Sequence, residues 1–69
     1  MEPDALFFRR RIAEELAAAE RAVTGAARLR RYQLVEAYLW QLERRGERLP
    51  VSKDELADLK AQCTQSRFV

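Results

Sequence analysis

Glycine and proline divide this chain into three segments, and that division limits the folds open to it. The chain has two glycines and two prolines, at Pro3, Gly25, Gly46 and Pro50. Both residue types interrupt helices, glycine through its conformational freedom and proline through its missing N–H group. Between these positions, apolar residues recur every three or four residues, which is the spacing of one helix face. The sequence therefore predicts an all-α fold of three helices.

The first predicted helix runs from about residue 4 to about residue 23. Pro3 suits a first-turn position, and Asp4 places negative charge at the positive end of the helix dipole. The residues of its apolar face are Ala5, Phe8, Ile12, Leu16, Ala19 and Val23. Gly25 can then end this helix as a left-handed C-cap, which would send the second helix back antiparallel. A continuous bent helix is the alternative, because a lone glycine costs a helix only about 1 kcal/mol.

The second and third predicted helices cover about residues 26–45 and 53–64. Gly46 is a natural terminator of the second helix, whose apolar stripe is Tyr32, Val35, Leu39 and Leu42. The third helix begins at a capping box formed by Ser52 and Glu55, and its apolar face is Leu56, Leu59 and Cys63. We expect a long antiparallel helical hairpin with a shorter C-terminal helix, in a single domain of residues 1–69 with a frayed tail at 65–69.

Few means of stabilisation are open to a chain of 69 residues. One cysteine, Cys63, excludes an internal disulfide, and the absence of histidine makes a zinc site improbable. Regular helix packing and oligomerisation remain, and two hairpins could pair into a helical bundle. No apolar run approaches the roughly twenty residues of a membrane-spanning helix, so we expect a cytoplasmic protein. We expect no cofactor, metal, small-molecule substrate or enzymatic activity, since no acid–base or nucleophile pattern is present.

Trp40 lies outside the apolar stripe of the second predicted helix. At about 100° per residue it is about 140° around from Val35, on the side of Leu29, and Phe7 is similarly displaced from the apolar face of the first helix. Burying such aromatic residues is worth several kcal/mol, so we expect Trp40 to be covered. The third helix could fold back over it, or another molecule could cover it. The sequence therefore predicts a protein-interaction module that forms a homodimer or docks onto another protein. The predicted contact residues are Phe7, Leu29 and Trp40, with Tyr32 and Tyr38 at the edge.

One arginine cluster suggests an alternative function. Arg28, Arg30 and Arg31 lie in the first turns of the second helix, where positive charge opposes the helix dipole. No acid follows them at the spacing of a helical ion pair, although Glu20 on the first helix could neutralise them across the hairpin. The alternative is an anion such as nucleic-acid phosphate, which would make the protein a small nucleic-acid-binding regulator. A helix-turn-helix reader is excluded, because the third helix begins with acids that phosphate would repel.

Overall fold

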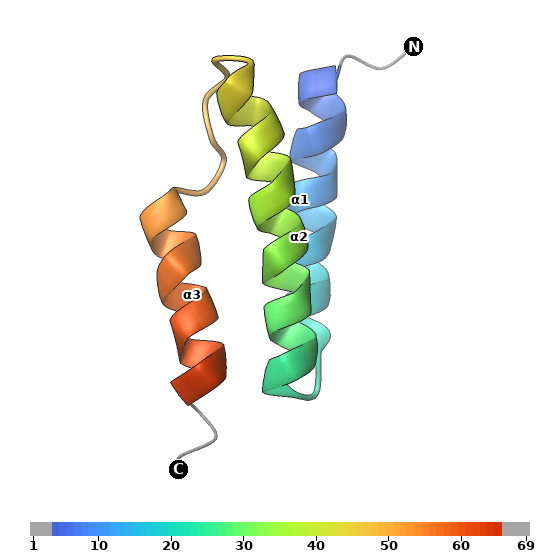
Figure 1. Cartoon of the computed structure of the whole chain (residues 1–69). Helices are drawn as coiled ribbons and strands as arrows, with labels where there is room; N and C mark the ends of the chain where they lie inside the picture. Colours follow the sequence, from blue (N-terminus) through green and yellow to red (C-terminus); the bar gives the residue numbers. More distant parts are fainter. Residues whose placement is uncertain (1–3, 66–69) are drawn as a thin grey trace.

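The computed structural model describes residues 4–65, without the side chains of residues 64 and 65, and these residues form three helices (Figure 1). They are α1 (Asp4–Arg21), α2 (Gly25–Arg44) and α3 (Lys53–Gln65). The predicted all-α hairpin with a shorter third helix is confirmed. Of the predicted frayed tail, Gln65 closes α3 and residues 66–69 lie outside the described residues. None of the three helices combines the length and the apolar character needed to cross a lipid bilayer.

The break between α1 and α2 is a turn, and Thr24 caps the helix that follows it. Thr24 has extended backbone angles, φ −112° and ψ 156°, and its Oγ1 accepts a hydrogen bond from the N–H of Ala27 at 3.1 Å. It is therefore the N-cap of α2. The expectation that Gly25 forms a left-handed C-cap was wrong, since Gly25 is the first residue of α2. Val23 was also misplaced on the apolar face: α1 ends two residues earlier, and Val23 is 93% exposed in the turn.

Gly46 ends α2, as the sequence predicts. Its φ of 71° lies in the left-handed region that favours glycine. The N–H of Glu47 donates to the carbonyl of Leu42 at 3.0 Å, and the N–H of Gly46 donates to the carbonyl of Glu43 at 3.0 Å. These two bonds form a Schellman motif, which satisfies the last carbonyls of the helix and turns the chain towards α3.

The predicted capping box starts α3. The N–H of Glu55 donates to Ser52 Oγ at 3.0 Å, and the N–H of Ser52 donates to Glu55 Oε1 at 3.4 Å. Val51, just before the box, packs against the core, and Leu56, just after it, is buried within the core. These contacts set where α3 begins and which of its faces points inwards.

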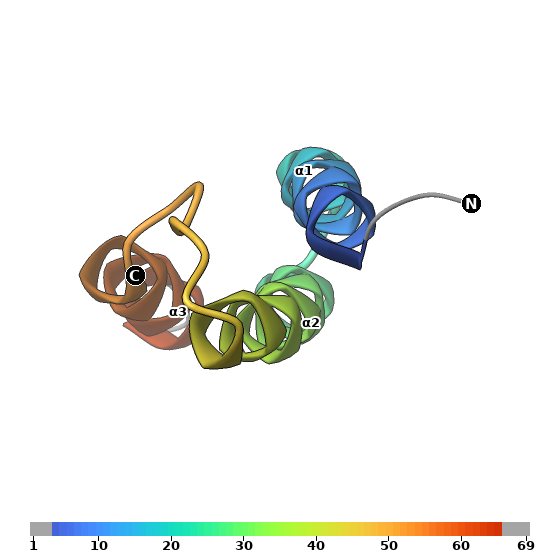
Figure 2. The ribbon, with the colours of Figure 1, turned by 90° about the horizontal axis from the view of Figure 1, so that it is seen from above.

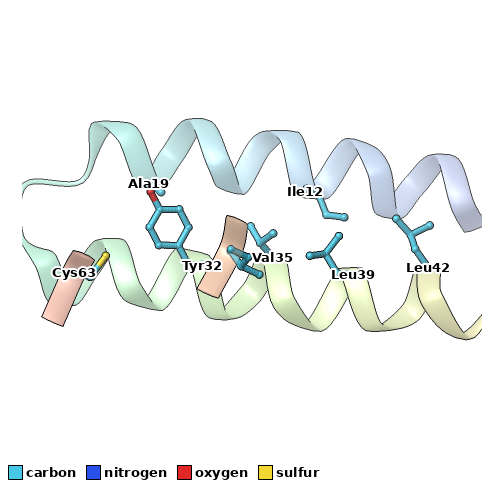
Figure 3. Close-up of a cluster of buried hydrophobic side chains, with 8 residues drawn as sticks. Ile12, Ala19, Tyr32, Val35, Leu39, Leu42 and Cys63 are labelled. Carbon is cyan, nitrogen blue, oxygen red and sulfur yellow. The ribbon is translucent and has the colours of Figure 1, made fainter. Parts of the chain in front are cut away.

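The core is a single cluster, and α2 supplies half of it. The predicted apolar stripe of α2 is fully buried, and most of the cluster lies between α1 and α2, with Cys63 joining it from α3 (Figure 3). The buried apolar residues are Ile12, Ala19, Tyr32, Val35, Leu39, Leu42, Leu56 and Cys63. The apolar periodicity therefore identified the inward faces of all three helices.

The three helices form an open arrangement around α2. Both α1 and α3 pack against α2, but these two outer helices make almost no contact with each other (Figure 2). The described chain is consequently thin, with principal extents of 45 × 21 × 13 Å. One side of α2 faces away from both neighbouring helices, and neither of them covers it.

Candidate protein-interaction surface

Trp40 lies on α2 beside its interface with α3, at a level between two ion pairs that join the two helices. Lys53 Nζ contacts Glu43 Oε2 at 2.6 Å, and Lys60 Nζ contacts Glu36 Oε1 at 2.8 Å. Trp40 comes between these two glutamates along α2, one turn from each. Although the two ion pairs hold α3 beside α2, Trp40 is still 57% exposed. Of the two covers that the sequence left open, the third helix is therefore not the one, and a cover by another molecule stays a prediction.

The small size of Ala57 explains this exposure. Along α3, Ala57 lies between Lys53 and Lys60, just as Trp40 lies between the paired glutamates of α2. Both residues are rotated about 40–60° further from the core than their charged neighbours. Helical register therefore places Ala57 as the nearest α3 counterpart of Trp40, and Ala57 is itself exposed. A methyl group has too little surface to cover an indole ring.

Trp40 belongs to an exposed stripe that runs the length of α2 on the side opposite the core. Its members recur at alternating spacings of four and three residues, and each of them is exposed. The stripe consists of Ala26, Arg30, Gln33, Ala37, Trp40 and Arg44, and we call it the outer stripe. Leu34, 38% exposed, borders it. Both acids of α2, Glu36 and Glu43, are held in the ion pairs with α3, so the outer stripe itself carries arginine as its only charged residue type.

Two of the predicted contact residues do not reach this surface. Tyr32 is 6% exposed and belongs to the core, so its predicted place at the edge of a contact is corrected. It lies about 60° from Val35 around α2, which is still within the inward face. Leu29 is half-buried and packs against the core cluster. Of the predicted contacts on the far side of α2, only Trp40 is therefore an exposed aromatic.

The other two, Phe7 and Tyr38, occupy a separate edge of the hairpin. The Phe7 and Phe8 rings are 5.4 Å apart edge-to-face, and the Phe8 and Tyr38 rings are 5.9 Å apart. The guanidinium groups of Arg45 and Arg11 lie over Phe8 at 5.1 Å and over Tyr38 at 5.9 Å. Hydrogen bonding to Tyr38 first, and then to Glu14, raises the pKa of Arg11. Phe7 is 38% exposed, but its neighbours already partner one another, so this edge is largely satisfied within the chain.

The arginine cluster of α2 is divided among three environments. Arg28 Nη2 donates to the carbonyl of Ala22 at 3.1 Å, which satisfies a carbonyl beyond the end of α1. Arg31 Nη1 contacts Glu15 Oε1 at 2.9 Å, so the partner across the hairpin is Glu15 rather than the expected Glu20. Arg30 is exposed on the outer stripe and has no ion-pair partner among the described residues. The three side chains thus do not form one anion site.

Glu15 is the important residue that the sequence analysis missed. It is 4% exposed, and its second oxygen accepts from Arg11 Nη2 at 2.9 Å while the first binds Arg31. A buried carboxylate needs such compensation, and two guanidinium groups at the α1–α2 interface supply it. The sequence feature that indicates its burial is its position about 60° from Ile12 around α1, which lies on the inward face of the helix.

The described residues include no candidate metal site, and their one cysteine is buried. Within residues 4–65, no three side chains of His, Cys, Asp or Glu lie together in a way that could hold a metal ion. Cys63 is buried, and its Sγ donates to the carbonyl of Leu59 at 3.3 Å.

No family model matches the chain, and comparisons with curated proteins and with solved structures also find no match.

Proposed function

We propose that this chain is a protein-interaction module whose contact surface is the outer stripe of α2. The observation that carries the proposal is the 57% exposure of Trp40 on an exposed face of α2. Tryptophan combines a large apolar area with few rotatable bonds, and it is enriched among the residues that dominate binding energy in protein interfaces.

The free energy available from covering Trp40 is substantial. A fully buried aromatic side chain removes about 150–250 Å² from water, so roughly half of that, on the order of 100 Å², remains to be covered. At about 25 cal/mol per Å², a partner that seals the ring gains about 2–3 kcal/mol from this residue. Leu34 is a further exposed apolar residue at the opposite border of the stripe, about 120° around α2 from Trp40. An interface built on this stripe therefore has one aromatic anchor and a separate apolar contact.

Docking onto a different protein is favoured over self-association, because the outer stripe of a second copy brings no acid to the two arginines. In a parallel pair about a twofold axis each arginine faces its own copy, and in an antiparallel pair centred on Ala37, Arg30 faces Arg44, so both arrangements bring like charges together. In an antiparallel pair centred on residue 35, Arg30 faces Trp40 and Arg44 faces Ala26, so no like charges meet but neither arginine gains an acid. A partner with acids at these positions therefore matches the stripe better than a second copy does.

The test compares three variants in quantitative capture from a lysate of the native host. Trp40→Ala removes the anchor, and Ala57→Leu places a larger side chain beside it, so both should deplete the same captured protein at least severalfold. Phe7→Ala is the matched control, since it removes an aromatic residue from the other edge of the hairpin and should leave capture unchanged. Trp40→Ala should also leave stability within about 1 kcal/mol, because a half-exposed side chain contributes little to the core.

Two results would contradict the proposal. One is equal capture by the wild type and Trp40→Ala. The other is depletion by Phe7→Ala alone. Sedimentation of the wild-type chain at micromolar concentration distinguishes the two forms of interaction, because a dimer that Trp40→Ala dissociates would show self-association instead of docking.

A further inference from the structure

We infer that the outer stripe receives an acidic amphipathic helix of another protein, an inference that rests on the proposed function. The stripe has a helix-matching shape, an apolar anchor and an uncompensated positive charge. Together these three features describe the partner.

The geometry of the stripe accommodates a helix. Its residues alternate at four and three positions and so form a straight line along one face of α2, on which a second helix can lie lengthwise. Ala26 and Ala37 have the smallest side chains along this line, so they permit a close approach of two helix axes. Figure 2 shows that no other element of the described chain occupies this side of α2. A partner helix can therefore lie along α2 without displacing α1 or α3.

The charge of the stripe selects acids. Arg30 and Arg44 lie two heptads apart, about 21 Å along the helix axis at 1.5 Å per residue. Neither has an ion-pair partner among the described residues, while the two acids of α2 are held by Lys53 and Lys60. Both arginines are therefore available to pair with acids of a docked partner. Acids that flank an apolar stripe at both ends of a docked helix would meet the two arginines.

Helix α3 of a second copy cannot be this partner. It does carry exposed acids, Asp54 and Asp58, and exposed Ala57 between them. Its larger apolar residues, however, face its own core, with Leu56 2% exposed and Leu59 packed against the cluster. It would therefore bring charge to the arginines but too little apolar surface to seal Trp40.

The experiment is selection from a displayed library of helical peptides against the full chain. The library keeps leucine or alanine at positions a and d, contains no tryptophan, and randomises the flanking positions. We expect selection to enrich Asp and Glu at the flanking positions. Binding of a selected peptide should shift the fluorescence of Trp40, the one tryptophan of the chain, to shorter wavelength. Binding should also weaken as salt is added.

Two arginine variants and a matched control test the charge argument. Arg30→Gln and Arg44→Gln should each weaken a selected peptide roughly 2- to 5-fold, which is the range of solvent-exposed ion pairs, and the double variant should flatten the salt dependence. Arg21→Gln removes an exposed arginine from α1, away from the stripe, and should leave the affinity unchanged.

The outcomes separate this inference from the proposed function. Selected peptides with neutral or basic flanks that still require Trp40 would overturn the acidic partner while leaving the interaction surface in place. A library without any binder that depends on Trp40 would overturn both. A single-stranded RNA 20-mer that binds through Arg30 and Arg44 more tightly than any selected peptide would assign the stripe to nucleic acid instead.

Discussion

Glu15→Gln is the substitution whose effect the structure defines most sharply. The Glu15 carboxylate is 4% exposed, and each of its oxygens accepts one guanidinium N–H at 2.9 Å. Glutamine has nearly the same shape but keeps only one acceptor oxygen, and its NH₂ group would face an arginine. The variant therefore loses one charge-assisted bond and leaves two guanidinium groups next to a neutral side chain.

The expected cost is about 2 kcal/mol. A hydrogen bond to a charged group is worth roughly 1.5–3 kcal/mol, and breaking a buried ion pair can cost 3–5 kcal/mol. The lower range applies here, because the side chains of Arg11 and Arg31 are 36% and 46% exposed and water can solvate them. In a domain of this size, 2 kcal/mol corresponds to a fall in Tm of roughly 10 °C. It is also a large share of a total stability of about 5 kcal/mol.

Urea unfolding followed by far-UV circular dichroism measures this loss, and Glu20→Gln is the matched control. Glu20 is exposed one helix turn or so further along α1, and the sequence had suggested it as the partner of the α2 arginines. Its replacement should change stability by less than about 0.5 kcal/mol. A double-mutant cycle of Glu15→Gln with Arg31→Gln should give a coupling above about 0.5 kcal/mol. Equal effects of Glu15→Gln and Glu20→Gln would refute the assignment of the buried ion cluster.

Two further substitutions test the helix boundaries. Gly46→Ala should lower the free energy of unfolding by about 1 kcal/mol in urea denaturation, because the φ of 71° disfavours an L side chain, although nothing within 4 Å would clash with the new methyl group. Gly25→Ala, at a helical position without positive φ, should be neutral or stabilising. A larger loss for Gly25→Ala than for Gly46→Ala would contradict the observed turn. Ser52→Ala removes the cap of α3 and should cost about 1 kcal/mol. Native-state hydrogen exchange should show that loss mainly in α3, so a uniform loss of protection over α1 and α2 would contradict a separable third helix.

Local chemistry made the helices predictable from the sequence. Gly46 and the Ser52–Glu55 box act through groups a few residues apart, so their roles could be inferred without knowing the rest of the fold. The first boundary was less certain because Gly25 could end one helix while the adjacent Thr24 could begin the next. Gly25 offers a left-handed conformation and Thr24 offers a side-chain cap, and the cap is the one that forms. That choice shortened α1 and moved Val23 out of the core and into the turn.

The candidate surface was only partly predictable, because periodicity describes one helix at a time. It correctly placed Trp40 on the side of α2 opposite the core. It could not show that the residue in register on α3 is Ala57, since this depends on how the two helices align. The same limit applies to Glu15, whose partner Arg31 lies 16 residues away on another helix. Tyr32 was assigned both to the apolar stripe and to the contact edge, and packing resolved this in favour of the stripe.

The two lysine–glutamate pairs between α2 and α3 connect the fold to the proposed function. They fix α3 beside Trp40, and they also neutralise the two acids that would otherwise border the outer stripe. Without Lys53 and Lys60, Glu36 and Glu43 would lie as unpaired acids one helix turn on either side of Trp40 and would repel an acidic partner. Because the α3 residue nearest in register to Trp40 is an alanine, α3 can dock on α2 and still leave Trp40 accessible. The open arrangement of the three helices thus sets the core on one side of α2. On the other side it leaves an anchor and two arginines that have no ion-pair partner within the described part of the chain.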